Sequence, residues 1–482
     1  MERPIYTFLE EHAARNPVSF HMPGHKGNLE LYKEAGYRVF FENPLAFDIT
    51  EIEGADNLFQ AESIIRETQK IYESLYGVKK SWLLINGTSG GILASVLASV
   101  KRGRKLVMAR NCHKSVFNAL TLGGIRPVFV RPELLPEYGV AGAVLPEAVD
   151  RALRENPDAD AVILPSPNYY GICSDICRIA EIVHRYGKVL IVDEAHGAHL
   201  KLLGGKHISG FGKLPLSAVD CGADLVVNSI HKTLASFTQS AVLHLNSGRV
   251  DPALVADCLQ AVESTSPSYL LMASLDLSAD IVEKRGKELA ENWISDLVWF
   301  YEESKTIPEL LVMRNLAGMD GTKINFSLEK VGVTGLELDA FLREKHGVYC
   351  ELVTGGLVMG MSGIGNRRAD YRRLLRGLRD AAETLGKKRG TTESPVMGKA
   401  PEPGEFAKVP RQRKTVPLSK AAGEICAGML IPYPPGIPLA CPGERLTNSI
   451  VSYIDDLRRN GTKVLGVSEQ RTVFVGADTE EK

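Results

Sequence analysis

The chain has 482 residues, of which 44% are apolar and 24% charged, and its formal net charge is −1. A chain of this length is too long for one simple core and predicts two or three domains. The near-zero net charge gives no reason to expect nucleic acid or an anionic membrane as a partner, and no apolar run is long enough to span a bilayer.

The eight cysteines are scattered along the chain, with no CxxC pair. Cys173 and Cys177 lie four residues apart, but no second pair of metal ligands follows nearby. The first residues also contain no apolar signal-peptide core. We therefore expect a cytoplasmic protein with eight reduced thiols and no metal site.

Residues 1–60 are predicted to form an N-terminal arm. Residues 4–16 have helical periodicity, which ends at Pro17 and the glycine-rich segment 21–27. The following run at residues 48–56 is unusually acidic. It either helps to attract a cationic substrate or is a solvated loop.

Residues 61–285 are predicted to form a large α/β domain, in which apolar strands alternate with helices. The expected strands are residues 81–85, 105–109, 127–130, 161–164, 189–193 and 225–228, and the expected helices include residues 61–76, 115–122 and 175–186. Because this alternation is typical of βαβ units, we expect a mainly parallel, doubly wound sheet.

Three strand ends in this domain carry reactive or ligand-binding groups. Gly87, Thr88 and Ser89 open a helix directly after a strand, where free N–H groups bind anions. Asp193 ends a second strand, and Lys232 follows a third. The carboxyl ends of such strands meet at one crevice. Taken alone, the lysine reads as a solvated loop residue, but a phosphate cradle, a buried aspartate and a lysine together predict a pyridoxal phosphate enzyme.

The rest of the chain divides into three parts. Residues 286–386 are predicted to form a smaller α/β domain, with helices at 294–304 and 335–346 and strands at 323–327 and 348–352. At residues 387–416, glycine, proline and charge replace large apolar residues, so we expect a linker. Within it, residues 387–415 should be the most protease-sensitive part of the chain. Residues 417–482 are expected to form a last small domain.

Four motifs together resemble one protein family. They are Ser229-Ile230-His231-Lys232, Asp193-Glu194-Ala195-His196, His21-Met22-Pro23-Gly24-His25-Lys26-Gly27 and Tyr433-Pro434-Pro435-Gly436-Ile437-Pro438-Leu439. Over almost its whole length the chain resembles the ornithine/lysine/arginine decarboxylases, which have the aspartate aminotransferase fold (fold type I). It is similar to their short form, which lacks an extra amino-terminal domain. Many fold-type I enzymes share the first two motifs, whereas the fourth is much narrower and points to the decarboxylases.

The resemblance implies a role for each residue around the cofactor ring. Lys232 joins pyridoxal phosphate covalently, and Asp193 pairs with its pyridinium nitrogen. His113 stacks on the ring, unless it only caps a helix. His196 contacts the ring's far side or its 3′-oxygen, where the larger family members usually carry an aromatic residue. His231 or Lys232 returns a proton to the substrate's Cα.

The resemblance also assigns the cofactor's phosphate. The groups that would hold it are Ser229, His231, Thr88 and Ser89, with Gly87 in the same turn. Ser264 and Ser266 match a family stretch that reaches the neighbouring subunit's cofactor phosphate, although a serine-rich loop serves equally well as a turn. The first interpretation implies a homodimer or higher homo-oligomer with a shared active site.

The implied substrate is a basic amino acid. Glu351 matches a family glutamate near the substrate, where it would meet the distal cation, unless it is a surface glutamate. His25, flanked by Gly24 and Gly27, either faces the substrate or belongs to a structural turn. Arginine is favoured because the chain resembles short members linked to agmatine synthesis, and because a guanidinium pairs bidentately with a carboxylate. Lysine and ornithine are the alternatives.

Two other functions stay open at this point. An aminotransferase or aldolase of the same fold would share Lys232 and Asp193, and an assay for carbon dioxide release would separate it from a decarboxylase. A non-catalytic cofactor-binding protein would have less reason to keep the lysine, the aspartate, the ring-stacking histidine and the phosphate residues together.

Overall fold

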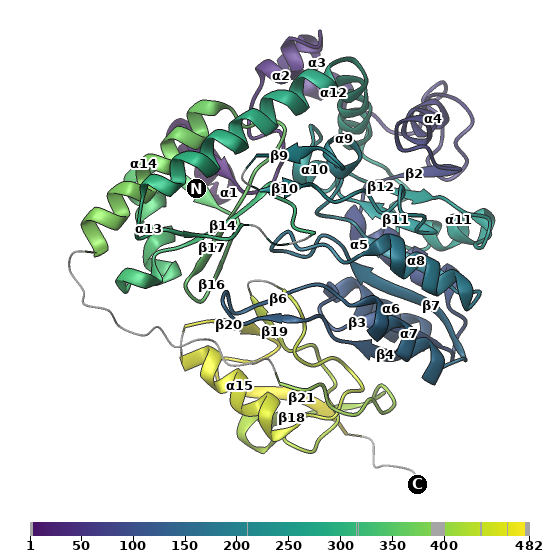
Figure 1. Ribbon diagram of the computed structural model, residues 1–482. Coiled ribbons are helices and arrows are strands. Elements are labelled where there is room, and N and C mark those ends of the chain that lie inside the picture. The colour runs from purple at the N-terminus through teal and green to yellow at the C-terminus, as the bar shows by residue number, and fades with distance from the viewer. Residues whose placement is uncertain are drawn as a thin grey trace.

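The structure is a computed structural model that describes residues 3–477 except 210, 315, 317, 387–400, 434–435 and 460. Residues 387–400 lie outside the described residues, and they make up much of the predicted linker and of its predicted protease-sensitive segment. Figure 1 shows the large sheet in blue and teal, the smaller sheet in green beside it, and the C-terminal domain in yellow.

A seven-stranded sheet forms the centre of the molecule, in the order β2-β12-β11-β8-β7-β3-β4. Every strand runs parallel to the others except β12, which is antiparallel to both of its neighbours. The strands are β2 (Lys80–Leu84), β3 (Lys105–Ala109), β4 (Arg126–Val130), β7 (Ala159–Pro165), β8 (Val189–Asp193), β11 (Leu225–Asn228) and β12 (Ala241–Leu245). The predicted doubly wound, mainly parallel sheet is confirmed.

Helices cover both faces of this sheet, and so its central strands are continuous apolar runs rather than alternating ones. The helices are α4 (Ile64–Tyr76), α5 (Gly87–Ser99), α6 (Lys114–Gly123), α7 (Pro146–Glu155), α8 (Ile176–Arg185) and α11 (Pro252–Gln260). Helix α4 ends at Gly77 in the left-handed conformation (φ 68°), as its sequence predicts. Shorter elements lie in the connections: β5 (Leu134–Leu135), β6 (Val140–Ala141), α9 (Leu200–Leu203), β9 (His207–Ile208), β10 (Gly212–Lys213) and α10 (Ile230–Thr233).

Helix α12 (Tyr269–Glu303) is a single helix of 35 residues that connects the two sheets. The domain boundary expected at residues 285/286 lies inside it, so the helix belongs to both parts. The smaller sheet is antiparallel and has the order β13-β14-β17-β16, and α13 and α14 pack beside it. Its elements are β13 (Leu311–Val312), β14 (Lys323–Ser327), α13 (Gly335–His346), β16 (Leu352–Thr354), β17 (Leu357–Met361) and α14 (Arg368–Leu385), with 3₁₀ turns η2 (Ser304–Thr306) and η3 (Glu329–Val331).

The arm joins the smaller domain through one strand pair. It consists of α1 (Pro4–Ala14), β1 (Val18–Phe20), α2 (Glu30–Lys33), α3 (Arg38–Glu42) and η1 (Pro44–Phe47). Strand β1 pairs in parallel with β15 (Val348–Cys350). The single strand predicted at residues 348–352 is therefore wrong: the chain leaves the arm's pair at Glu351 and continues as β16 in the smaller sheet.

The C-terminal domain has its own apolar core and two short antiparallel strand pairs, β18 with β21 and β19 with β20. Its elements are β18 (Arg413–Pro417), η5 (Leu418–Lys420), β19 (Ile431–Tyr433), α15 (Asn448–Arg459), β20 (Lys463–Leu465) and β21 (Thr472–Gly476). Across the described part of the chain, the helices are all too short or too polar to cross a bilayer.

The prediction of eight reduced thiols is wrong for two of them, because the structure joins Cys177 to Cys221 in a disulfide. Cys177 lies on α8, and Cys221 precedes β11. Since β8 and β11 are neighbours, the fold brings the two Cα atoms within 4.3 Å although 44 residues separate them in sequence. The other six cysteines are free.

A thiol titration tests this bond. Denatured protein prepared without reductant should show six reactive thiols and, after digestion, a joined peptide pair containing Cys177 and Cys221. Replacing both by serine should lower the free energy of unfolding by about 2–4 kcal/mol, because the bond restricts the unfolded chain. A titre of eight thiols would contradict the structure and restore the sequence-based expectation.

Candidate active site

A pocket opens at the carboxyl ends of the large sheet's strands, where such crevices form in open α/β sheets. Five of the predicted site residues line it: Thr88, His113, Asp193, His196 and Lys232. Asn111, Tyr169 and Ile437 also line the pocket, the last of them from the fourth family motif.

Lys232 lies on α10, a single helical turn that follows β11. Its Nζ is 3.0 Å from Nε2 of His196. Burial lowers the pKa of Lys232; the carboxyl groups of Asp193 and Glu351 oppose this effect, and the nearby Lys323 adds to it. A lowered pKa leaves more of the amine unprotonated and therefore nucleophilic.

Asp193 ends β8 and is 6% exposed. Its Oδ1 accepts a hydrogen bond of 3.2 Å from the backbone N–H of Ala195. Burial raises the pKa of Asp193, while the charge of Lys232 and the Ala195 hydrogen bond oppose the rise. A cation placed in the pocket would therefore favour the ionised carboxylate.

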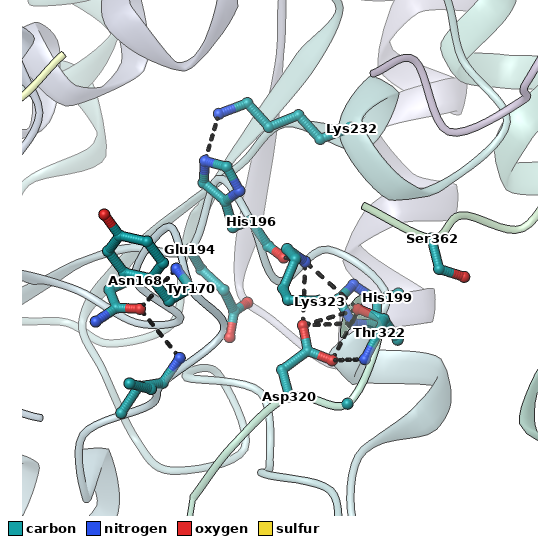
Figure 2. Close-up of polar contacts among 12 residues, drawn as sticks. Asn168, Tyr170, Glu194, His196, His199, Lys232, Asp320, Thr322, Lys323 and Ser362 are labelled. Carbon is teal, nitrogen blue, oxygen red and sulfur yellow. Dashed lines mark hydrogen bonds and ion pairs between the residues drawn. The ribbon is translucent and has the colours of Figure 1, made fainter. Parts of the chain in front are cut away.

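His196 comes three residues after Asp193, and its ring points toward Lys232, as Figure 2 shows. Burial and the two nearby lysines, Lys232 and Lys323, hold the pKa of His196 well below its usual value, so the imidazole is neutral. A neutral ring that accepts from Lys232 at Nε2 carries its own proton on Nδ1. That Nδ1 is buried and has no hydrogen-bond partner within the described part of the chain.

The start of helix α5 has the geometry that an anion cradle would need. Gly87 begins the helix with φ 68°, a conformation that favours glycine. Oγ1 of Thr88 lies 3.1 Å from Oγ of Ser229, which joins the start of α5 to the end of β11. Ser89 is half-buried in the same first turn. The unpaired N–H groups of this turn and the two hydroxyls are suited to a phosphate.

Glu263 lies against the same helix start, which the sequence gave no reason to expect. Its Oε2 accepts hydrogen bonds from the backbone N–H groups of Asn86 (2.9 Å) and Ile85 (3.3 Å), and its Oε1 is buried without a partner. Burial raises the pKa of Glu263 to about 7, against the effect of those two N–H groups. Below that pH the carboxyl is mostly neutral, which reduces its repulsion of an anion in the cradle.

His113 fits both of its predicted interpretations. Its Nδ1 accepts from Ser115, at 2.9 Å from the hydroxyl and 3.3 Å from the backbone N–H, so it caps helix α6. The same residue lines the pocket. Burial lowers the pKa of His113 to about 4. A neutral ring at this place is compatible with stacking on an aromatic ligand.

His231 and His25 make contacts of a different kind. Nδ1 of His231 lies 2.9 Å from the carbonyl oxygen of Ser240, and Nδ1 of His25 accepts from the N–H of Gly27 at 3.0 Å. Neither residue is among those that line the pocket. Their contacts support the structural interpretation of His25 and leave Lys232 as the better placed of the two predicted proton donors.

At Gly24, the backbone of the arm contacts the backbone of α10, the helical turn that carries Lys232. Its N–H donates to the carbonyl oxygen of His231 at 2.6 Å, and its own carbonyl accepts from Gly365 at 3.0 Å. A Cβ at this position would lie 2.6 Å from the backbone N of Leu234. Only glycine fits here, and the arm therefore helps to fix the position of Lys232.

Glu351 lies on the inner side of the arm rather than on an open surface. Its Oε2 accepts from the N–H of Met22 at 2.9 Å. Burial raises the pKa of Glu351, and the Met22 hydrogen bond and the charges of Lys232 and Lys26 oppose the rise. Its carboxylate thus acts on Lys232 from the small-domain side.

Ser264 and Ser266 lie in an exposed turn of this chain, where the N–H of Ser266 donates to Oγ of Ser264 at 3.1 Å. They are not among the residues that line this chain's own pocket.

Arg110 connects the pocket to the C-terminal domain, a role that its sequence context did not indicate. It directly follows β3 and donates to the carbonyl oxygens of Pro438 (2.5 Å) and Leu439 (2.7 Å) and to the fully buried Glu444 (3.4 Å). Ile437, the residue directly before Pro438, lines the pocket. Arg110 therefore holds the C-terminal turn against the site.

Comparisons with known proteins agree with this arrangement. The family described as "Orn/Lys/Arg decarboxylase, major domain" matches residues 3–314, and "Orn/Lys/Arg decarboxylase, C-terminal domain" matches residues 387–471. An arginine decarboxylase of Bacillus subtilis is 32% identical over 497 aligned residues, covering 100% of this chain and 99% of that protein. A lysine decarboxylase of Pseudomonas aeruginosa, LdcA, is 24% identical and covers 94% of this chain and 75% of that protein.

Solved structures share the fold. Lysine decarboxylase A from Pseudomonas aeruginosa superposes with a TM-score of 0.75 at 21% identity, covering 98% of this chain and 80% of the other. The fold is that of the fold-type I pyridoxal phosphate enzymes. Within that class, the chain belongs to the Orn/Lys/Arg decarboxylase family, a family of amino-acid decarboxylases.

The contacts that Arg110 makes with Pro438, Leu439 and Glu444, here called the clamp, can be tested with a pair of variants. Arg110→Ala should lower the free energy of unfolding by about 3 kcal/mol, because Glu444 is left buried without its cation. Arg110→Ala/Glu444→Gln should recover much of that stability in denaturant titrations. Its turnover should nevertheless stay about tenfold or more below wild type, since Ile437 is no longer held at the pocket. Equal recovery of stability and turnover would argue that the clamp serves folding alone.

Proposed function

We propose that this chain decarboxylates arginine to agmatine with pyridoxal 5′-phosphate bound in the pocket. The observation that carries the proposal is the full-length match to an arginine decarboxylase, because the match to a lysine decarboxylase is weaker and spans less of that protein. Lysine or ornithine as substrate is the second candidate, since the family description includes all three amino acids.

The residues present fit that cofactor. Two buried atoms of pocket residues, Nδ1 of His196 and Oδ1 of Asn111, have no hydrogen-bond partner among the residues that the structure describes. Beside them lie one carboxylate, that of Asp193, and the anion cradle of Thr88 and Ser229. A ring with polar substituents, one cationic nitrogen and a phosphate would satisfy each of these groups.

When bound, pyridoxal phosphate supplies an electron sink for the electron pair that carbon dioxide leaves behind at Cα. Lys232 would hold the cofactor, and Asp193 would keep a proton on the pyridine nitrogen by direct pairing. The hydroxyls of Thr88 and Ser229 would bind the phosphate. Because its pKa is lowered and it lies in the pocket, Lys232 is suited to return the proton to Cα.

The substrate's distal cation would meet Glu351. The carboxylate is half-buried, lies between the arm and the small domain and is within electrostatic reach of Lys232. A guanidinium can pair with it bidentately, which a shorter ornithine ammonium cannot reproduce.

We further propose that the active protein is a homodimer or higher homo-oligomer whose subunits share the site. Helix α1 buries none of its residues in this chain, and Ile5 and Phe8 are 76% and 65% exposed. Ser266 is exposed and away from its own pocket, where it could reach a second copy. Apolar exposure of this kind is typical of a surface that a partner covers.

The direct test is a substrate panel. Purified protein loaded with pyridoxal phosphate should convert arginine to agmatine and release one carbon dioxide per amine, read by mass spectrometry. Lysine and ornithine should react far more slowly, and Lys232→Ala should abolish the reaction with all three. Cadaverine or putrescine as the main product would favour the second candidate, and no amine from any of the three would refute the proposal.

Glu351→Gln tests the substrate contact separately. The amide keeps an acceptor for the Met22 N–H but loses the charge. The ratio of kcat/KM values for arginine should therefore correspond to a loss of roughly 2–4 kcal/mol of transition-state binding. The visible absorbance of the bound cofactor should stay the same, which serves as the control. Wild-type kinetics in this variant would exclude Glu351 as the selecting residue and make the acidic segment 48–56 the next candidate.

A further inference from the structure

Lys323 is a second buried lysine behind the pocket, and the roles given so far do not use it. It begins β14 in the smaller sheet and is fully buried. Its Nζ donates to the carbonyl oxygen of His196 at 3.0 Å and pairs with Oδ2 of Asp320 at 3.1 Å. Figure 2 shows the resulting series of contacts, from Lys232 through His196 to Lys323 and Asp320.

Asp320 is itself fully buried and completes a closed polar cluster. Its carboxylate lies 3.1 Å from Nε2 of His199 and accepts from the hydroxyl of Thr322 at 2.8 Å. Burial alone would raise the pKa of Asp320, but His199, Lys323 and these hydrogen bonds hold it far below its usual value. The carboxylate is therefore ionised, and its nearest cation is Lys323.

A buried ion pair of this kind adds little to stability over apolar side chains of the same volume, although breaking it is costly. Its geometry is therefore the better guide to what it does. The pair lies where the smaller domain touches two walls of the pocket.

The first wall is the turn that carries His196, which Lys323 holds by its carbonyl. The second is the loop with Tyr169 and Tyr170. The N–H of Asp320 donates to the carbonyl of Gly171 at 2.7 Å, and a Cβ on Gly171 would lie 2.8 Å from Cβ of Lys323.

The two walls meet inside the pocket. The rings of Tyr169 and His196 are in contact, with centroids 4.7 Å apart. The side chain of Asn325, two residues after Lys323 on β14, donates to the carbonyl of Tyr170 at 2.9 Å. Moving the start of β14 would therefore move both rings together.

We propose that Lys323, paired with Asp320, is a positioning residue that fixes the His196 ring against Lys232 and against the Tyr169 wall. This inference rests on the proposed role of Lys232 as the reactive amine and does not depend on which amino acid is the substrate. Lys323 touches no reacting atom and acts through the carbonyl of His196, through its packing against Gly171 and through its charge.

The positive charge of Lys323 also acts on Lys232. The groups that act on its ammonium or face it from the surrounding elements are Asp193, Glu351, His113, His196, His231 and Lys323. Among these, Lys323 is a second cation and lowers the pKa of Lys232 further. Asp320, which lies behind Lys323, acts on His196 and opposes the lowering of its pKa.

The test replaces the ion pair by a neutral pair, Asp320→Asn/Lys323→Met, so that no charge is left buried alone. Ser362→Ala is the matched control. Ser362 is buried in the adjoining strand region and hydrogen-bonds Trp293 at 2.5 Å, but its substitution changes no charge and leaves its N–H bonded to the carbonyl of Thr322 at 3.0 Å. A second variant, Asp320→Glu, keeps both charges and displaces the carboxylate by one methylene.

Two readouts separate positioning from folding. In the holoenzyme, the neutral pair should lower kcat about tenfold or more with KM little changed, because the geometry of the reacting groups is disturbed. In the full chain without cofactor, trace labelling of Lys232 by acetic anhydride across pH reports the titration of its amine by mass spectrometry. The labelling profile should shift to higher pH in the neutral pair, since a neighbouring cation is gone, and stay in place in Ser362→Ala.

An unchanged labelling profile in the folded neutral-pair variant would overturn the proposal, whatever happens to kcat. If the neutral pair does not fold, Asp320→Glu decides: lower kcat with an unshifted profile supports the positioning role, and wild-type kcat overturns it. The labelling needs no turnover, so a protein inactive on all three amino acids would refute the proposed function while leaving this result readable.

Discussion

The site depends on keeping a lysine amine inside the protein next to a neutral imidazole. Burial opposes the ammonium form of Lys232, and its hydrogen-bond partner is His196, whose own pKa is held low by the same environment. A carboxylate in hydrogen-bond contact would instead fix the amine as an inert ion pair. The carboxylates of Asp193 and Glu351 act on Lys232 through space. In the proposed function, they remain available to pair with the cofactor and the substrate.

This environment is assembled by every part of the chain. The large sheet supplies Lys232 and Asp193 at adjacent strand ends. The arm fixes the lysine's turn through Gly24, and the smaller domain holds the opposite side through Lys323. The C-terminal domain adds Ile437, held in place by Arg110. The domains are separate in sequence, but all of them contribute to the site. Loosening any of these contacts between domains would change the position or the surroundings of the Lys232 amine.

The sequence predicted the parts of this arrangement that follow local rules. Strands β3, β8 and β11 fall where apolar runs predict them, because strands buried on both faces need apolar residues throughout. Lys232 and Asp193 were found because each stands at the end of such a strand. Contacts such as Lys323 with His196, 127 residues apart, leave no local pattern. The Cys177–Cys221 bond and the position of Glu263 depend in the same way on how the sheet is ordered, which no single segment encodes.

We propose that Lys232 is the amine that holds the cofactor, and borohydride reduction tests this assignment. Protein loaded with pyridoxal phosphate is reduced with borohydride, digested, and its peptides are sequenced by mass spectrometry. We expect the pyridoxyl label on Lys232. Two other lysines, the half-buried Lys26 and the buried Lys323, lie close enough to act on the charges of this site. A label on either of them would refute the assignment.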